Sequence, residues 1–224
     1  MRKFLFILLI SLFAPTIFCQ QSAESETAKR LYTAGLVNIK TADSTIVVDL
    51  KYATTDNFVG KNMYGDFTEA YLQPDAAKML ANAQKKLKQT NRNWSIVVYD
   101  AARPRSVQQR MWEVVKDTDW KNYVASPSRI SMHSYGVAVD VGIVDENGNA
   151  VDMGTAFDEF TEKSQPRYEQ RFLQENKLTG QQINNRLILR NAMQAAGFRT
   201  IRNEWWHFEA MTREQAKQKY KPID

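Results

Sequence analysis

Segments with strand and helix patterns follow one another along this 224-residue chain without strict alternation. Segments rich in β-branched and aromatic residues predict strands at 37–51 (one or two strands), 94–99, 137–144, 198–201 and 205–209. Apolar residues at helical spacing predict helices at 74–89, from 104 onward, at 181–196 and after 212. A doubly wound parallel sheet needs regular alternation of the two patterns. We therefore predict an α+β fold, with a central antiparallel sheet flanked by helices.

Local signals mark the ends of the predicted helices. Pro74 and Pro104 suit a first helical turn, Gly197 suits the position after a helix, and Thr212 with Gln215 forms a capping box. The residues expected to face inward are Leu80, Ala83 and Leu87 in the first helix, and Val107, Met111, Val114 and Val115 in the second. The segment 51–66 has Asn, Asp and Gly at loop spacing and is expected to be an ordered loop.

The chain shows no repeat, no low-complexity segment and no linker long enough to divide domains, so a single domain is expected. With 43% hydrophobic and 25% charged residues, the composition excludes a disordered chain and a collagen-like repeat. A chain of this length buries roughly 70% of its unfolded surface, so it needs no metal merely to fold.

The first residues indicate a targeting segment. Arg2 and Lys3 precede an apolar run over 4–13, and polar sequence begins at Gln20, which is typical of a secretory signal peptide over residues 1–19. The run is too short for a mature transmembrane span. We expect an exported, periplasmic protein with a loose polar leader over 20–36 and the folded domain over 37–224. A lipid anchor on Cys19 and a buried N-terminal helix are the alternatives.

Charge and cysteine content narrow the function further. Removal of residues 1–19 takes the net charge from +5 to +3, and the basic residues are interleaved with acids, so no nucleic-acid partner is predicted. The chain has one cysteine, Cys19, and cleavage after this residue would leave the mature chain without any. Disulfides, thiolate catalysis and cysteine-based zinc sites are then excluded.

The chain has only two histidines, and each lies in an unusual setting. His133 lies in a polar, Gly-containing loop that leads into a strand carrying Asp140. A carboxylate in a β-branched strand is costly unless it is paired or binds a metal, although the strand could also expose that face. His207 lies among aromatic residues and, taken alone, could be a core histidine.

Together the two histidines and Asp140 form a ligand set that catalytic zinc uses, with the fourth position left for water. Glu204, three residues before His207, is then a carboxylate near the metal that could act as a base. Residues three apart on a regular strand point to opposite faces. Glu204 must therefore lie at a bend or bulge just before the strand if it serves the same site.

These residues belong to a longer set of ordered motifs. They are 51–60 (KYATTDNFVG), 99–104 (YDAARP), 131–140 (SMHSYGVAVD), 152–158 (DMGTAFD) and 204–207 (EWWH). The set resembles the D-alanyl-D-alanine dipeptidases of the zinc peptidase family M15 over nearly all the mature chain. The histidine–aspartate and Glu-x-x-His motifs are shared with other branches of that family, including D,D-carboxypeptidases.

The resemblance implies a role for each matching residue. His133, Asp140 and His207 would bind one Zn²⁺ ion per chain, in a cleft. Glu204 would be the catalytic base and Arg103 would steady the oxyanion, although the sequence alone favours a surface salt bridge for that arginine. Asp158 would receive the substrate's amino group, and Ser131 and Tyr52 would be pocket residues.

The expected reaction is hydrolysis of the small substrate D-Ala-D-Ala to D-alanine, with a zinc-bound water activated by a glutamate. Two alternatives remain open: a D,D-carboxypeptidase or endopeptidase acting on peptidoglycan stem peptides, and a non-catalytic wall-binding module. The oligomeric state and the physiological role, glycopeptide resistance or recycling of wall dipeptides, are left open by the sequence.

Overall fold

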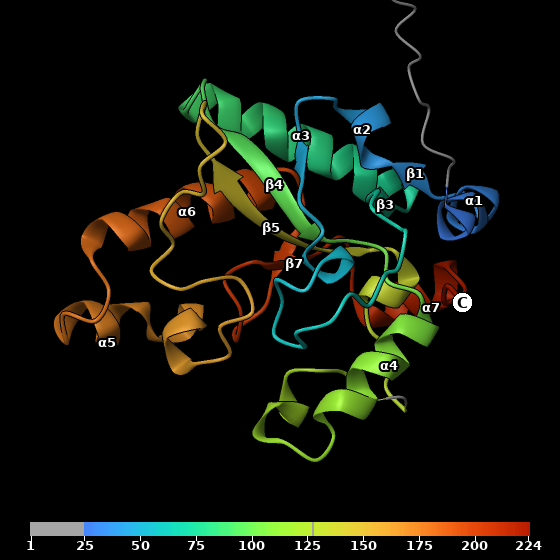
Figure 1. Cartoon of the computed structure of the whole chain (residues 1–224). Coiled ribbons are helices and arrows are strands. Elements are labelled where there is room, and N and C mark those ends of the chain that lie inside the picture. The colour runs from blue at the N-terminus through green and yellow to red at the C-terminus, as the bar shows by residue number, and fades with distance from the viewer. Residues whose placement is uncertain (1–24, 127) are drawn as a thin grey trace, which may run out of the picture.

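The computed structural model describes residues 25–126 and 128–224 (Figure 1). The predicted signal peptide and Cys19 lie outside these residues, as does the first part of the expected leader. No helix within the described ranges is both long and apolar enough to cross a membrane.

A mixed five-stranded sheet forms the centre of the described chain. Its order is β2 (Val47–Val48), β4 (Ser95–Asp100), β5 (Ala138–Val144), β7 (His207–Glu209) and β6 (Arg199–Thr200). The pairs β4–β5, β5–β7 and β7–β6 are antiparallel, as predicted. The prediction is wrong at the edge, where β2 runs parallel to β4. The reason is the long connection through a helix between β2 and β4, because parallel neighbours require such a crossover.

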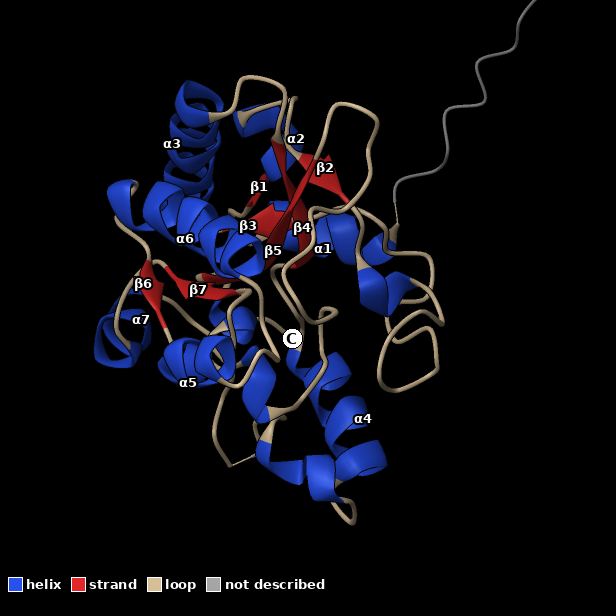
Figure 2. Cartoon of the chain, turned by 90° about the vertical axis from the view of Figure 1, so that its left-hand side faces the viewer, coloured by secondary structure: helices blue, strands red, loops and turns tan. Residues whose placement is uncertain are grey.

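The helices surround this sheet (Figures 1 and 2). They are α1 (Glu26–Thr33), α2 (Ile39–Ala42), α3 (Pro74–Thr90), α4 (Arg105–Val115), α5 (Glu169–Gln174), α6 (Gly180–Ala195) and α7 (Arg213–Lys219). Short 3₁₀ helices are η1 (Lys51–Ala53), η2 (Asp119–Asn122), η3 (His133–Tyr135), η4 (Glu162–Ser164) and η5 (Pro166–Tyr168). A separate antiparallel pair joins β1 (Val37–Asn38) to β3 (Tyr71–Leu72).

The main core lies between the sheet and the helices α3 and α6, which pack against each other. The predicted α3 stripe is confirmed, because Leu80, Ala83 and Leu87 are fully buried. The α4 prediction is wrong for Val114, which is 39% exposed. The buried apolar residues of α4 recur every four positions, at 107, 111 and 115, so that residue 114 falls on the flank of the helix.

The structure corrects one further prediction about local structure and confirms two others. The expected loose leader contains α1, whose Ala28 and Leu31 are buried in the core. Two apolar residues three positions apart share one helical face, which is enough to dock a two-turn helix. The capping box of Thr212 and Gln215 is present, and Gly197 follows α6 with a φ of 99°.

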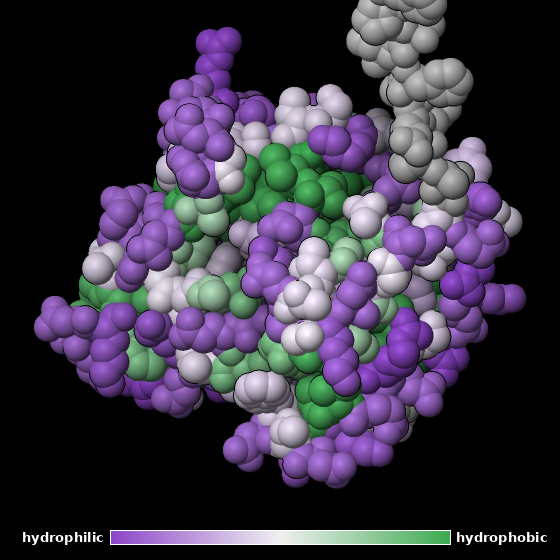
Figure 3. Space-filling view, in the orientation of Figure 1, coloured by the Kyte–Doolittle hydropathy of each residue, from purple (hydrophilic) through white to green (hydrophobic). Residues whose placement is uncertain are grey.

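The strand β5 lies in the middle of the sheet, and all seven of its residues are buried. The alternative of an exposed face at Asp140 is therefore wrong, because this residue is only 4% exposed. The molecular face seen in Figure 1 is largely hydrophilic, with its largest hydrophobic patch in the upper part and smaller ones elsewhere (Figure 3). Because Asp140 is buried inside the sheet, contact with solvent does not explain its presence there.

Candidate metal centre and active site

The sheet register brings three polar residues into one row. Asp140 on β5 pairs with His207 on β7 and, on its other side, with Asp100 on β4. Directly opposed residues of neighbouring antiparallel strands project to the same face. An irregularity in β4 between Val98 and Asp100 accompanies this pairing.

His133 reaches the same place from the short helix η3, just before β5. Gly136 ends η3 with a φ of 70°, and a Cβ there would lie 3.0 Å from the Leu36 side chain. Both observations favour glycine at this turn. The His133 Nδ1 atom lies 2.8 Å from the Ala101 carbonyl oxygen, and Nε2 lies 3.4 Å from an Asp140 carboxylate oxygen.

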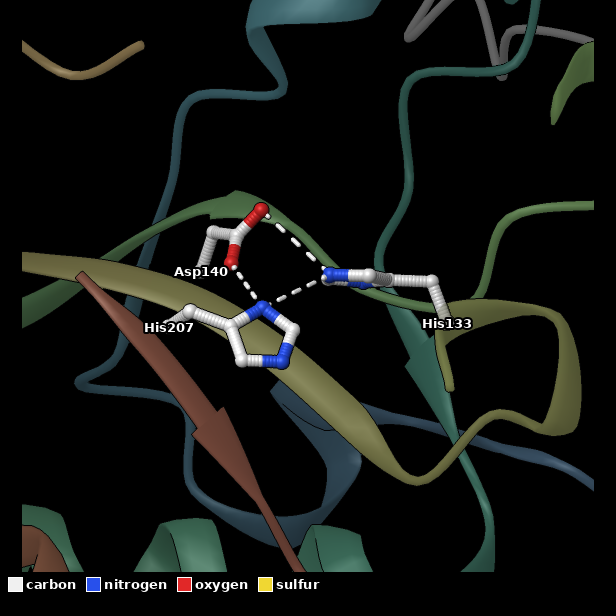
Figure 4. A group of neighbouring side chains, drawn as sticks. All are labelled: His133, Asp140 and His207. Atoms are coloured by element: carbon white, nitrogen blue, oxygen red, sulfur yellow. Dashed lines mark hydrogen bonds and ion pairs between the residues drawn. The ribbon is translucent and has the colours of Figure 1, made fainter. Parts of the chain in front are cut away.

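The side chains of His133, Asp140 and His207 converge (Figure 4). One ligand atom from each lies within 4.8 Å of the others, and His207 Nδ1 is 2.9 Å from Asp140 Oδ1. The outer ring nitrogen of His207 faces Glu209, with Nε2 3.6 Å from Oε1. Each imidazole thus has a partner at its other ring nitrogen. Two such imidazoles and one carboxylate fit a divalent metal ion of the zinc type.

The charge of Asp140 matches this arrangement. Burial acts to raise its pKa, but the charges and hydrogen bonds of His133 and His207 outweigh burial and hold the pKa well below its usual value. The carboxyl is therefore ionised, as a metal ligand must be.

Glu204 lies in the irregular segment before β7, which begins only at His207 and not at residue 205 as expected. The bend predicted from the sequence is thus present. Glu204 Oε2 lies 4.0 Å from His207 Nδ1, and its side chain is 16% exposed. Burial raises the pKa of Glu204 to about 7. A carboxyl with such a pKa can both take and give a proton near neutral pH.

Arg103 is buried, so the interpretation as a surface salt bridge is wrong. Its Nε and Nη2 atoms donate to Asp100, and Nη1 donates to Gln108 at 2.8 Å. Burial acts to lower the pKa of Arg103, but Asp100 outweighs it and raises the pKa well above its ordinary value. The Tyr64 hydroxyl also donates to Asp100, which is fully buried. The guanidinium is therefore a fixed positive charge.

Tyr52 and Asp158 form a second polar group near the arginine. The Tyr52 hydroxyl donates to Asp158 Oδ2 at 2.7 Å, and the guanidinium carbon of Arg103 lies 5.0 Å from the Tyr52 ring centre. Asp158 has a φ of 57°, in the left-handed region. Burial raises the pKa of Asp158 well above its usual value. The Ser131 Oγ accepts a hydrogen bond of 3.3 Å from the backbone N–H of His133.

One cavity of about 450 Å³ collects all of these predicted residues. Its lining includes Tyr52, Arg103, Ser131, His133, Asp140, Asp158, Glu204 and His207. The sequence reasoning missed the supporting residues Tyr64, Asp100, Gln108 and Glu209. Asp100 could have been found, because its spacing of three from Arg103 lies inside a motif already noted.

Comparisons with known proteins show the family of this chain. A family model described as D-Ala-D-Ala dipeptidase, of the M15 peptidases, matches residues 32–222. The D-alanyl-D-alanine dipeptidase of Escherichia coli (strain K12) is 34% identical over 177 residues, covering 79% of this chain and 85% of that protein. The enzyme of the same name from Enterococcus faecium is 31% identical over 180 residues, covering 71% and 83%. The chain belongs to the D-Ala-D-Ala dipeptidase family of M15 peptidases.

Proposed function

We propose that this protein hydrolyses D-Ala-D-Ala to free D-alanine, with one Zn²⁺ ion held by His133, Asp140 and His207. The observation that carries the proposal is the single cavity that gathers these three residues with Glu204 and Arg103. The names of the similar proteins support the substrate. A zinc ion at this position would supply a Lewis acid to the scissile carbonyl and to the attacking water.

Glu204 takes the proton from the attacking water and later gives it to the leaving amine. Both histidines face the metal centre, so neither is free for this task. The Glu204 carboxyl lies beside His207 without being one of the three converging groups. A base in this position contributes about 10²- to 10⁴-fold to the rate.

Arg103 stabilises the negative charge that develops on the carbonyl oxygen. Its hydrogen bonds to Asp100 and Gln108 use three of the five N–H groups of a guanidinium and hold its plane. The remaining N–H groups can donate to the substrate oxygen. Because the arginine is already held in place, it needs little reorganisation during the reaction.

Asp158 receives the free amino group of the dipeptide, with Tyr52 holding the carboxylate, and Ser131 contacts the substrate's other end. A peptide extended at its N-terminus has no free amine at this position. It would place an uncharged acyl group against the Asp158 carboxyl and lose the charge pairing that a free ammonium group provides. This arrangement selects free dipeptides over longer chains.

The test is a competition assay with the zinc-loaded protein. Free D-Ala-D-Ala should be cleaved much faster than N-acetyl-D-Ala-D-Ala, L-Ala-L-Ala or a pentapeptide stem, and removal of zinc by a chelator should stop cleavage. Faster cleavage of the stem would instead favour a D,D-carboxypeptidase. Cleavage that persists in the metal-free protein would overturn the zinc-dependent mechanism.

We also propose that the protein is exported, on the strength of its first 19 residues. A C-terminally tagged full chain should appear in the periplasmic fraction with its N-terminus at Gln20. Membrane association that is lost in Cys19→Ala would indicate the lipid-anchored alternative. An intact N-terminus in the cytoplasmic fraction would rule out both.

A further inference from the structure

The loop over residues 152–164 carries Asp158 but is held from outside the cavity. We propose that Arg186 is a positioning residue, which fixes the place of Asp158 relative to Glu204 and thereby sets the preference for a free amino group. The inference deepens the proposed function and rests on it, since it assumes that Asp158 binds the substrate amine.

Arg186 ties the two ends of this loop together. It lies on α6 with a fully buried side chain. Its Nε donates to the Met153 carbonyl at 2.7 Å and its Nη1 donates to the Lys163 carbonyl at 3.0 Å. These carbonyls lie on either side of Asp158 in the sequence. A planar guanidinium can hold two acceptors at a fixed separation, which a lysine cannot do.

Other residues of the same helix hold the start of the loop. The Asn185 amide donates to the Asp152 carbonyl at 2.8 Å, and the Gln182 amide donates to the Asp152 carboxylate at 2.9 Å. Together with Arg186 these residues are spaced by three and four positions, so they lie on one helical face. That face of α6 therefore acts as a template for the loop.

The loop needs external support because its key residue is strained. Asp158 has a positive φ of 57°, which costs about 1–3 kcal/mol for a residue other than glycine. Its carboxylate is held by one hydrogen bond, from Tyr52. If the loop ends were released, the backbone at Asp158 could relax and move the carboxylate away from the amine-binding position.

The loop is also joined to the segment that carries Glu204. The backbone N–H of Trp205 donates to the Ser164 carbonyl at 3.1 Å, and its indole N–H donates to Thr155 Oγ1 at 2.8 Å. The guanidinium carbon of Arg186 lies 5.9 Å from the centre of the Trp205 ring. One arginine thus contacts both segments whose separation must match the length of a dipeptide.

Stability alone is a poor explanation for this arginine. A buried ionic group is often no more stabilising than apolar residues of similar volume. Within the described residues, the Nη2 atom of Arg186 has no hydrogen-bond partner. Since Arg186 does not line the cavity, its effect on substrate must pass through the loop.

The experiment compares Arg186→Met and Arg186→Lys with the matched control Arg190→Gln. Arg190 lies one turn along α6 and binds Glu169, as Arg186 does. Among the described residues it makes no hydrogen bond to the loop. The measured quantity is the ratio of kcat/KM for D-Ala-D-Ala to that for N-acetyl-D-Ala-D-Ala, with zinc content and far-UV circular dichroism recorded for each variant.

Arg186→Met should lower this ratio at least about 10-fold at full zinc content, mainly through KM for the free dipeptide. Arg186→Lys should fall between Arg186→Met and wild type, and Arg190→Gln should keep the wild-type ratio. An unchanged ratio in folded, zinc-loaded Arg186→Met overturns the proposal. If that variant does not fold, an unchanged ratio in Arg186→Lys does so.

Amide hydrogen exchange over residues 152–164 provides a readout that does not require catalysis. Exchange should be faster in the Arg186 variants than in Arg190→Gln, and equal exchange would overturn the proposed hold on the loop. If wild-type protein fails to cleave D-Ala-D-Ala, the proposed function fails, whereas exchange still decides whether Arg186 holds the loop.

Discussion

Two buried clusters of charge differ in how their groups are used. The cluster at the cavity has an excess of acids around Arg103 and the two histidines; the acids are Asp100, Asp140, Asp158, Glu204 and Glu209. The cluster between α5 and α6 has two arginines, Arg186 and Arg190, around the single carboxylate of Glu169. Both clusters are largely shielded from solvent.

The difference lies in what the acids face. Burial raises the pKa of Glu204 and of Asp158, two carboxyls that line the cavity. In the α5–α6 cluster the carboxylate accepts from both arginines, and Arg186 donates to backbone carbonyls. Burial of charge is therefore not by itself a sign of catalysis. Acids that crowd one another beside a cavity are the better indicator.

The largest expected effect comes from the metal centre. His207→Ala should lose the bound metal and with it all activity, because two ligands hold zinc far less tightly than three. Elemental analysis after dialysis measures the metal content. Arg190→Gln, the control from the other cluster, should keep one zinc per chain. Full zinc occupancy in His207→Ala would contradict the site.

The second prediction distinguishes the catalytic base from the metal ligands. Glu204→Gln should keep its zinc but lose about 10²- to 10⁴-fold in turnover, since the general base is gone. Glu169→Gln, which alters the buried glutamate of the other cluster, should retain near wild-type turnover. The check is kcat at saturating dipeptide, and near-normal turnover in Glu204→Gln would remove it from the mechanism.

Asp158→Asn should lower kcat/KM and, at the same time, raise the free energy of unfolding. The loss of the charged partner for the amine should lower kcat/KM about 10- to 100-fold, through KM. Because burial raises the pKa of Asp158, the folded wild type keeps this proton at pH values where the unfolded chain has lost it. The stability from this group is full below about pH 4 and is lost as pH rises through the raised pKa.

Urea unfolding at pH 5 and pH 8 tests this sign. The free energy of unfolding of Asp158→Asn should exceed that of wild type, by more at pH 8 than at pH 5, because the variant does not titrate. The prediction would be wrong if the variant were less stable than wild type at pH 8, or if the difference in unfolding free energy became smaller with rising pH. Either result would show that ionisation of Asp158 does not destabilise the folded protein.

The last prediction concerns the fit of the loop against Leu178, just before α6, and against Gln182 on α6. Gly154 and Gly148 have similar positive φ values of 81° and 83°, but an added Cβ at Gly154 would lie 2.3 Å from Leu178, whereas at Gly148 it meets nothing within 4 Å. Gly148→Ala should cost about 1–2 kcal/mol in unfolding free energy. Gly154→Ala should cost about 1–3 kcal/mol more, from overpacking. Equal losses of unfolding free energy in the two variants would show that the loop can shift to accommodate the added methyl group.

Much of the fold was predictable because local signals and burial agreed. The stripe of Leu80, Ala83 and Leu87 and the capping box at Thr212 are short-range patterns that the structure keeps. The direction of β2 was not predictable, since it depends on a connection some 45 residues long. Helix α1 was missed because its sequence is mostly polar, and only Ala28 and Leu31 are buried in the core.

The candidate site divides in the same way. Eight of the residues that line the cavity were predicted, since their motifs resemble a family and their types suit zinc hydrolysis. The residues that hold them or their loops in place, such as Asp100, Gln108 and Arg186, were missed. They act through contacts between segments distant in the sequence, and no local pattern reports such contacts.

By itself the sequence determined the chemistry available to this protein. It has two histidines, one cysteine near the start, and a glutamate three residues before His207, which limits the metal ligands and the base to a few groups. Only the tertiary structure decided which groups meet. The register that pairs Asp140 with His207, and the arginine that joins both ends of the Asp158 loop, come from strand pairing and helix packing. Such contacts form only once distant segments are buried together.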